Sequence, residues 1–353
     1  TDSVATPNFD RIAQIGVKAK SMQASFPTKT FPNHYALATG LYPDHNGIVN
    51  NTFFDPERGV RYSIGDREKV RDAYFYEGEP IWNTVEKQGL KSAILYWVGS
   101  EAPIQNIRPS IWKTYDHNFP FEQRIDTVIS WLQYPENTKP QLIMWYVDQP
   151  DGLGHRYGPF SEEANSAVEY LDGLLGDFMN KLSNIPNGDQ VNVILLSDHG
   201  MAKLSQDKQL FLDKILKPEW TEGIYGGNPI YNIKAKEGYI DSITSAINKV
   251  KGVQAYKNTD VPERLHYGTH PRTLDLLALA DSSYTLLANS ERPYTSNGTH
   301  GYDNRNTDMD AIFYAYGPAF KTNYSQPRFQ NVSVYPLFCR ILGLEEAPND
   351  GDI

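Results

Sequence analysis

The chain has 353 residues, of which 40% are hydrophobic and 22% are charged, and this composition is ordinary for a soluble globular protein. Its formal net charge of −10 argues against a nucleic-acid-binding surface, so no binding to a nucleic acid duplex is expected. The single cysteine excludes an internal disulfide, and no run of about 18 apolar residues predicts a transmembrane segment.

Taken in chain order, helical and strand-like patterns alternate along most of the sequence. Short apolar runs bounded by turn formers predict buried strands, as expected where helices cover both faces of a sheet. Apolar positions at helical spacing, with Pro or Ser at the start and Gly at the end, predict helices. The predicted helices are 7–16, 32–40, 161–182 and 332–342, and the predicted strands are 92–98, 141–147, 191–197 and 311–316.

This alternation predicts an α/β fold in which a mainly parallel central sheet carries helices on both faces. The absence of repeats, low-complexity tracts and flexible linkers favours a single domain over residues 1–353. Residues 220–277 alternate less cleanly, and we interpret them as a small insertion or subdomain. In open α/β sheets, ligands bind beyond the carboxyl ends of the strands, so the residues that follow the predicted strands are the first candidates for a site.

Metal-ligand residue types follow two of these strands. Asp151 and His155 come after strand 141–147, and Gly152 and Gly154 disfavour a helix there, so we expect a tight loop that points both side chains at one ion. Taken alone, this segment is equally consistent with a solvated turn.

Asp198 and His199 directly follow strand 191–197, where a buried carboxylate and imidazole need a partner such as a divalent cation. The alternative is an aspartate that caps the next helix. His300 lies between turn formers, and taken by itself it is more typical of a surface or hydrogen-bonded histidine. Together these clusters offer two carboxylates and three imidazoles, a ligand set that suits zinc.

A different signal surrounds Thr30. Pro32 is well placed in the first turn of a helix that runs to Gly40, so Thr30 would lie just before the helix N-terminus. Free backbone N–H groups and the positive end of the dipole favour a phosphate and an alkoxide at this position. The sequence does not separate a nucleophilic Thr30 from a threonine that only caps the helix.

These segments resemble the nucleotide pyrophosphatase/phosphodiesterases, or type I phosphodiesterases, of the alkaline-phosphatase superfamily. The resemblance covers nearly the whole chain and implies an alkaline-phosphatase-like catalytic domain. It is carried by 27–35 (Pro-Thr-Lys-Thr-Phe-Pro-Asn-His-Tyr), 39–49, 151–155, 198–199, 300–304, 309–320 and 342–349.

The resemblance implies two zinc ions and a nucleophilic Thr30, with Asn51 hydrogen-bonding the phosphate. Phe31 and Tyr115 match the aromatic walls around the base, and Trp97 and Tyr146 match positions in the substrate pocket. The family's first-strand Asp-Gly motif is absent, so the strand that carries it is expected upstream of Thr1. The implied ligands are Asp151, His155 and His300 for one zinc, and Asp198, His199, the Thr30 oxygen and that first-strand aspartate for the other.

The implied activity is zinc-dependent hydrolysis of phosphodiester or pyrophosphate bonds in small molecules, most closely nucleotides, through a phosphothreonine on Thr30. Alternatives on the same site are a phosphodiesterase of choline phospholipids and a phosphomonoester or phosphonate hydrolase. The absence of arginine from the Thr30 and Asn51 motifs favours diesters over monoesters. A non-catalytic zinc-binding relative is a third alternative. The resemblance also implies export, to a periplasmic or extracellular location.

Overall fold

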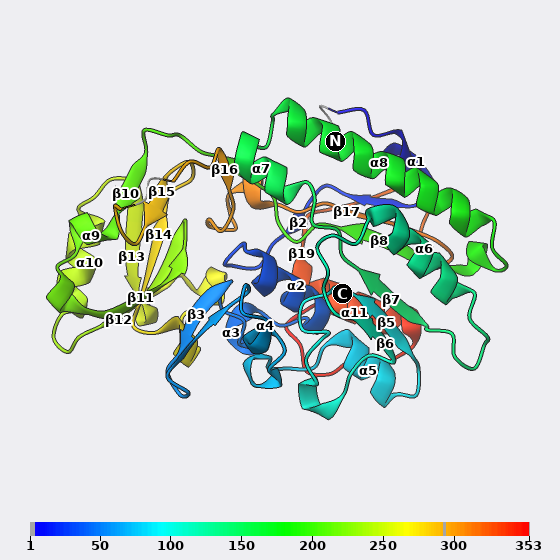
Figure 1. Ribbon diagram of the computed structural model, residues 1–353, viewed down its shortest axis with the longest axis horizontal. Coiled ribbons are helices and arrows are strands. Elements are labelled where there is room, and N and C mark those ends of the chain that lie inside the picture. The colour runs from blue at the N-terminus through cyan, green and yellow to red at the C-terminus, as the bar shows by residue number, and fades with distance from the viewer. Residues whose placement is uncertain (1–3, 292–293, 353) are drawn as a thin grey trace.

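The computed structural model describes residues 4–291 and 294–352, and two sheets lie at the centre of its larger part (Figure 1). One sheet has the strand order β18-β1-β17-β8 and the other has the order β6-β5-β7. The first comprises β1 (Val17–Ala19), β8 (Val193–Leu196), β17 (Phe313–Tyr316) and β18 (Tyr324–Gln326). The second comprises β5 (Ser92–Leu95), β6 (Ile111–Lys113) and β7 (Leu142–Trp145).

Strand direction agrees with the predicted α/β class. The pairs β1–β18, β5–β6 and β5–β7 are parallel, whereas β17 runs antiparallel to both β1 and β8. Each of the four predicted strands is present but shorter than its apolar run. At β7 and β8 the run continues past the strand into the segment that leads to the candidate site residues Asp151 and Asp198.

Helices cover both faces of these sheets, as the sequence predicts (Figure 1). On one side, Phe9, Ile12, Val128 and Phe178 share a core with Val193 and Tyr314 of the first sheet. The helices on this side are α1 (Pro7–Ile15), α6 (Phe121–Leu132) and α8 (Glu162–Ser183). The helices on the other side are α2 (Thr30–Thr39), α5 (Ile81–Lys87) and α11 (Val334–Leu342).

The helix ends follow the capping signals in the sequence. The Ser161 hydroxyl accepts a hydrogen bond from Ala164 N at 3.1 Å and so satisfies one free donor at the start of α8. The residue at the start of helix α1 makes no capping hydrogen bond with its side chain. Instead, the buried Asp172 of α8 accepts a hydrogen bond from Phe9 N at 3.0 Å and so satisfies a free donor at the start of α1. Gly40 ends α2 with φ 67°, a left-handed conformation that glycine adopts without strain.

Residues 221–280 form a separate antiparallel sheet beside the larger part (Figure 1, left). Its strand order is β11-β12-β14-β13, and helix α10 packs on it around a core that includes Ile233, Ile243 and Leu276. The elements are β11 (Thr221–Gly227), β12 (Ile230–Ala235), α10 (Ile240–Asn248), β13 (Val253–Lys257) and β14 (Leu276–Ala280). This lobe extends three residues beyond the end of the predicted insertion at 277.

A buried arginine fastens the lobe to the larger part. Arg272 is 3% exposed, and its Nε donates to Asp55 Oδ2 at 2.8 Å. Its Nη1 donates to the carbonyls of Gly47 and Phe75 at 2.9 and 2.8 Å. A buried charge this fully hydrogen-bonded fixes the relative position of the segments that it joins.

The edges of the two central sheets leave a deep groove. Among the described residues, β7 and β8 each pair with a strand on one side only. Both line a cavity of about 850 Å³, bounded by residues 140–151 and 190–201 and by apolar side chains of α6, α8 and α11. The cavity reaches Thr30, Asp151, Asp198 and His199, so the candidate site lies at one end of the groove. No helix in the described part of the chain is long and apolar enough to cross a membrane.

Candidate metal centre and active site

Thr30 is the first residue of α2, and Lys29 occupies the cap position, so Thr30 does not merely cap the helix. Most donors near this helix start are already used. Phe31 N donates to Asn51 Oδ1 at 2.9 Å, Pro32 has no N–H, and Asn33 N donates to Lys29 O at 3.1 Å. The sequence predicted several free N–H groups around Thr30. In the first turn of α2, only the N–H of Thr30 itself is left as a free donor.

Asp151 and His155 lie on a helix, α7 (Asp151–Tyr157), and the predicted tight loop is wrong. The helical spacing of four residues brings His155 Nε2 to 3.5 Å from Asp151 Oδ1. Gly154 lies at a tightly packed position of this helix. A Cβ on Gly154 would lie 3.2 Å from Met201 Cε, and the Gly154 carbonyl closely approaches Gly298. Each interior glycine destabilises the helix by about 1 kcal/mol relative to alanine.

His155 and His300 are oriented by backbone carbonyls. His155 Nδ1 lies 2.9 Å from Gly298 O, and His300 Nδ1 lies 2.8 Å from Thr28 O. A carbonyl can only accept, so Nδ1 carries the proton and Nε2 presents its lone pair. Both Nε2 atoms face Asp151 Oδ1, at 3.5 Å from His155 and 3.7 Å from His300. Asp151 Oδ1 is buried without a hydrogen-bond partner.

His199 repeats this pattern beside Thr30. Its Nδ1 donates to Gly200 O at 2.8 Å, so Nε2 is left facing Asp198 Oδ2 at 3.1 Å and Thr30 Oγ1 at 3.3 Å. Two lone pairs at 3.1 Å repel each other unless a proton or a cation lies between them. The aspartate after strand β8 therefore belongs to the site, and no helix follows directly for it to cap.

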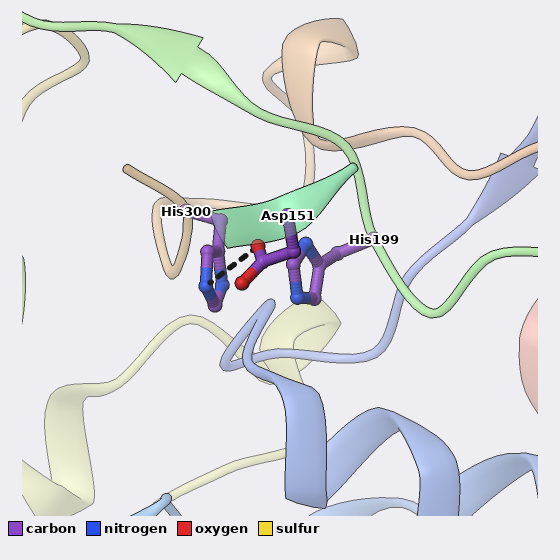
Figure 2. Close-up of side chains that lie close together, drawn as sticks. All are labelled: Asp151, His199 and His300. Carbon is purple, nitrogen blue, oxygen red and sulfur yellow. Dashed lines mark ion pairs between the residues drawn. The ribbon is translucent and has the colours of Figure 1, made fainter. Parts of the chain in front are cut away.

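Three of these residues form a compact group (Figure 2). Ligand atoms of Asp151, His199 and His300 all lie within 4.8 Å of one another, and the rings of His199 and His300 stack with centroids 3.6 Å apart. This group does not match the expected division into two ion sites. The expectation assigned His199 to one ion, and Asp151 and His300 to the other. Convergent imidazole nitrogens and an orphaned carboxylate oxygen fit a cation such as zinc.

Burial keeps two of the imidazoles neutral. Burial lowers the pKa of His155 against the pull of Asp151, and burial together with His199 and Lys29 holds the pKa of His300 well below its usual range. Burial alone would lower the pKa of His199 too, but Asp198 raises it. Neutral imidazoles are the form that binds a metal, so His155 and His300 are ready for one at neutral pH.

The predicted substrate residues lie in three places. Asn51 Oδ1 is used by Phe31 N, which leaves the Asn51 amide nitrogen as a free donor beside Thr30. Trp97 and Tyr146 line the cavity together with Thr30. Tyr115 does not line this cavity; it is half-buried, packs edge-on against Tyr96, and its N–H donates to Glu101 at 3.1 Å.

Two residues of the site were missed by the sequence analysis. His34 lies one helical turn after Thr30, and its Nδ1 is 2.9 Å from Thr30 O and 3.3 Å from Asp198 Oδ2. Lys29 is buried, and its ammonium donates to Asn228 O of the smaller lobe. Burial lowers the pKa of Lys29 to about 7, against the pull of Asp151. The spacing of four residues from Thr30 was the available signal for His34.

Comparison with known proteins points to one family. The family model for type I phosphodiesterase / nucleotide pyrophosphatase matches residues 2–303. Human ectonucleotide pyrophosphatase/phosphodiesterase family member 1 is 37% identical over 98% of this chain and 38% of its own length. The venom phosphodiesterase CdcPDE of Crotalus durissus collilineatus is 36% identical over 98% of this chain and 42% of its own length. The chain therefore spans about two fifths of these relatives.

The match to solved structures covers a larger share of the matched chain than the match to these relatives does. Murine ectonucleotide pyrophosphatase/phosphodiesterase 5 superimposes with a TM-score of 0.94 at 33% identity, over 99% of this chain and 93% of that chain. Its inactive threonine-to-alanine variant, in complex with AMP, gives a TM-score of 0.94 at 32% identity, over 99% of this chain and 92% of that one. The alkaline-phosphatase-like α/β fold is thereby confirmed, and the chain belongs to the type I phosphodiesterase/nucleotide pyrophosphatase family.

Proposed function

We propose that the chain hydrolyses phosphodiester or pyrophosphate bonds of small molecules, with nucleotides as the substrate class and Thr30 as the nucleophile. The observation that carries this proposal is the position of the Thr30 hydroxyl, 3.3 Å from His199 Nε2 within a cluster of metal-ligand side chains. The AMP complex of a structural relative supports a nucleotide substrate.

The chain's own residues suggest how a metal would be held. We assign Asp151, His155 and His300 to one zinc ion, and Asp198, His199 and Thr30 to a second. When bound, zinc would supply positive charge that stabilises an ionised Thr30 hydroxyl and the phosphate. The two assignments share the compact Asp151, His199 and His300 group, so the ions would be close neighbours.

Thr30 would attack phosphorus through Oγ1, and the alcohol or phosphate leaving group would depart as the new P–O bond forms. Water would then hydrolyse the phosphothreonine and regenerate the hydroxyl. The Asn51 amide nitrogen, held by the bond from Phe31 N to Asn51 Oδ1, would donate to a non-bridging oxygen. Trp97 and Tyr146 would contact the rest of the substrate. Phe31 and Tyr115 would flank a base that extends beyond the cavity, because neither residue lines it.

The charges around the cavity favour a diester over a monoester. A monoester carries more negative charge, but no arginine lines the cavity among the described residues. The ammonium of Lys29 is committed to Asn228 O. This disfavours the phosphomonoester alternative, and the neutral donor of Asn51 suits the single charge of a diester.

The ratio of two rates tests this substrate preference. We expect kcat/KM for bis-p-nitrophenyl phosphate to exceed that for p-nitrophenyl phosphate by about a hundredfold, which corresponds to about 2.7 kcal/mol of transition-state stabilisation. p-Nitrophenyl esters of nucleotides and p-nitrophenylphosphorylcholine, compared in the same assay, separate nucleotide from choline-lipid chemistry. Faster cleavage of the monoester would contradict the proposal, and absence of any hydrolysis would favour a non-catalytic relative.

We also propose that a further strand lies in the groove between β7 and β8. Within residues 4–291 and 294–352, each of the two strands has one unpaired edge that faces a largely apolar cavity, and a strand between them would satisfy the backbone groups of each. Residues preceding Thr1 are the proposed source, and the family's first-strand aspartate would then lie beside Asp198. Residues 1–353 together with this strand would act as one catalytic domain.

Hydrogen exchange tests the strand proposal. In a longer polypeptide that carries the preceding residues, amides of β7 and β8 should exchange at least about tenfold more slowly than in the 353-residue polypeptide. Amides of β5, which is paired on both sides, provide the control and should be protected in both proteins. Equal exchange at β7 and β8 in the two proteins would rule out a strand in the groove.

Export, to a periplasmic or extracellular location, is also part of the proposal. The venom phosphodiesterases among the relatives support it, because venom is a secreted fluid.

A further inference from the structure

His34 is a buried residue of the site that the proposed chemistry does not use. It is 5% exposed and lies on α2, one turn after Thr30. Its ring is enclosed by Trp97 at 4.9 Å and Tyr146 at 5.0 Å between centroids, both edge-on. Trp97 Nε1 also donates to His34 O at 2.9 Å, so ring and backbone are both held.

The polar edge of His34 faces two acceptors. Its Nδ1 lies 2.9 Å from Thr30 O and 3.3 Å from Asp198 Oδ2. A carbonyl and a carboxylate both accept, so Nδ1 carries a proton that is shared between them. One side chain thus connects the backbone of the proposed nucleophile with the carboxylate of a proposed metal ligand.

The side chains that face Asp198 among the described residues are His34 and His199. Asp198 Oδ2 also faces His199 Nε2 at 3.1 Å, but Nε2 bears a lone pair when Nδ1 donates to Gly200 O. A neutral His199 therefore cannot donate to the carboxylate. Asp198 also borders the cavity that reaches Thr30.

We infer that His34 is a positioning residue that orients Asp198: its Nδ1–H restrains the carboxylate through Oδ2 and so holds it beside His199 Nε2 and Thr30, where it would bind a cation. This inference rests on the proposed function, because it requires Asp198 to be a metal ligand. Hydrogen bonds that orient a ligand in this way typically change metal affinity by about 10- to 100-fold.

Three substitutions isolate the hydrogen bond. In His34→Asn, the amide nitrogen lies as many bonds from Cα as Nδ1 and can replace it as donor. In His34→Gln, the nitrogen lies one bond further, at the distance of Nε2. His34→Leu keeps the apolar volume between Trp97 and Tyr146 and removes the donor.

The readout is metal binding, measured by titrating metal-free protein with Zn²⁺ and, for the spectrum of the bound ion, with Co²⁺. We expect His34→Gln and His34→Leu to weaken the affected site by about 10- to 100-fold, and His34→Asn to remain within about threefold of the native protein. In turnover assays kcat should fall for the first two variants while KM changes little. Thermal unfolding of the metal-free variants should be alike for His34→Asn and His34→Gln.

The outcomes separate the inference from the function on which it rests. If the native protein binds no divalent cation, the proposed function fails and the inference fails with it. If the native protein binds Zn²⁺ but all three variants bind it equally well, only the role of His34 is overturned. Equal losses in His34→Asn and His34→Gln would overturn it too, because a donor at the Nδ1 position would then have no effect.

Discussion

Replacement of Thr30 by alanine is expected to lower kcat/KM for bis-p-nitrophenyl phosphate by at least about a thousandfold. The hydroxyl is the only group of Thr30 that can form a bond to phosphorus, and it lies 3.3 Å from His199 Nε2 in the metal-ligand cluster. The metal content should stay near that of the native protein, because the other proposed ligands are unchanged. Steady-state kinetics and metal analysis on the same sample measure both.

Thr30→Ser is the matched control, because it retains the hydroxyl and loses only a methyl group. We expect it to keep activity within about a hundredfold of the native protein. If Thr30→Ala retained full activity against the diester, the nucleophile assignment would be wrong. If instead both variants lost their metal, Thr30 would have to be regarded mainly as a ligand or a structural residue.

Removal of the metal is the second change with a large expected effect. Asp151→Asn keeps the size of the side chain but removes the charge that faces His155 and His300 at 3.5 and 3.7 Å. We expect this variant to lose bound zinc and to lose activity by about a thousandfold or more, as should native protein treated with a chelator. Added Zn²⁺ should restore the chelated native protein and not the variant.

Asp148→Asn is a control for the loss of one negative charge at the same cavity. Asp148 borders the cavity three residues before Asp151, but its oxygens face Arg124 at 3.4 Å and His117 at 3.5 Å instead of the metal-ligand cluster. This variant should keep its metal. Full activity after chelation, or equal metal loss in both aspartate variants, would contradict the assignment of Asp151 as a ligand.

Local chemistry in the sequence predicted where two of the helices begin or end. Ser161 caps α8 and Gly40 ends α2 because these residues satisfy the free donors or adopt the left-handed backbone that helix ends require. The same local reasoning failed at Asp151 and His155. Glycine disfavours a helix in isolation, but at Gly154 the lack of a side chain leaves room for Met201, and at Gly298 it leaves room for the Gly154 carbonyl. The segment is helical despite the local preference.

By itself, the sequence indicated candidate metal ligands, because an aspartate and a histidine that follow a buried strand need a partner for their charge and lone pairs. It did not determine how those side chains point. The proton on each imidazole is placed by a carbonyl from a distant segment, Gly298 for His155 and Thr28 for His300. Only the tertiary structure brings these carbonyls into place, and it alone made His34 a neighbour of Asp198, because hydrogen bonds depend on positions in space and not on spacing along the chain.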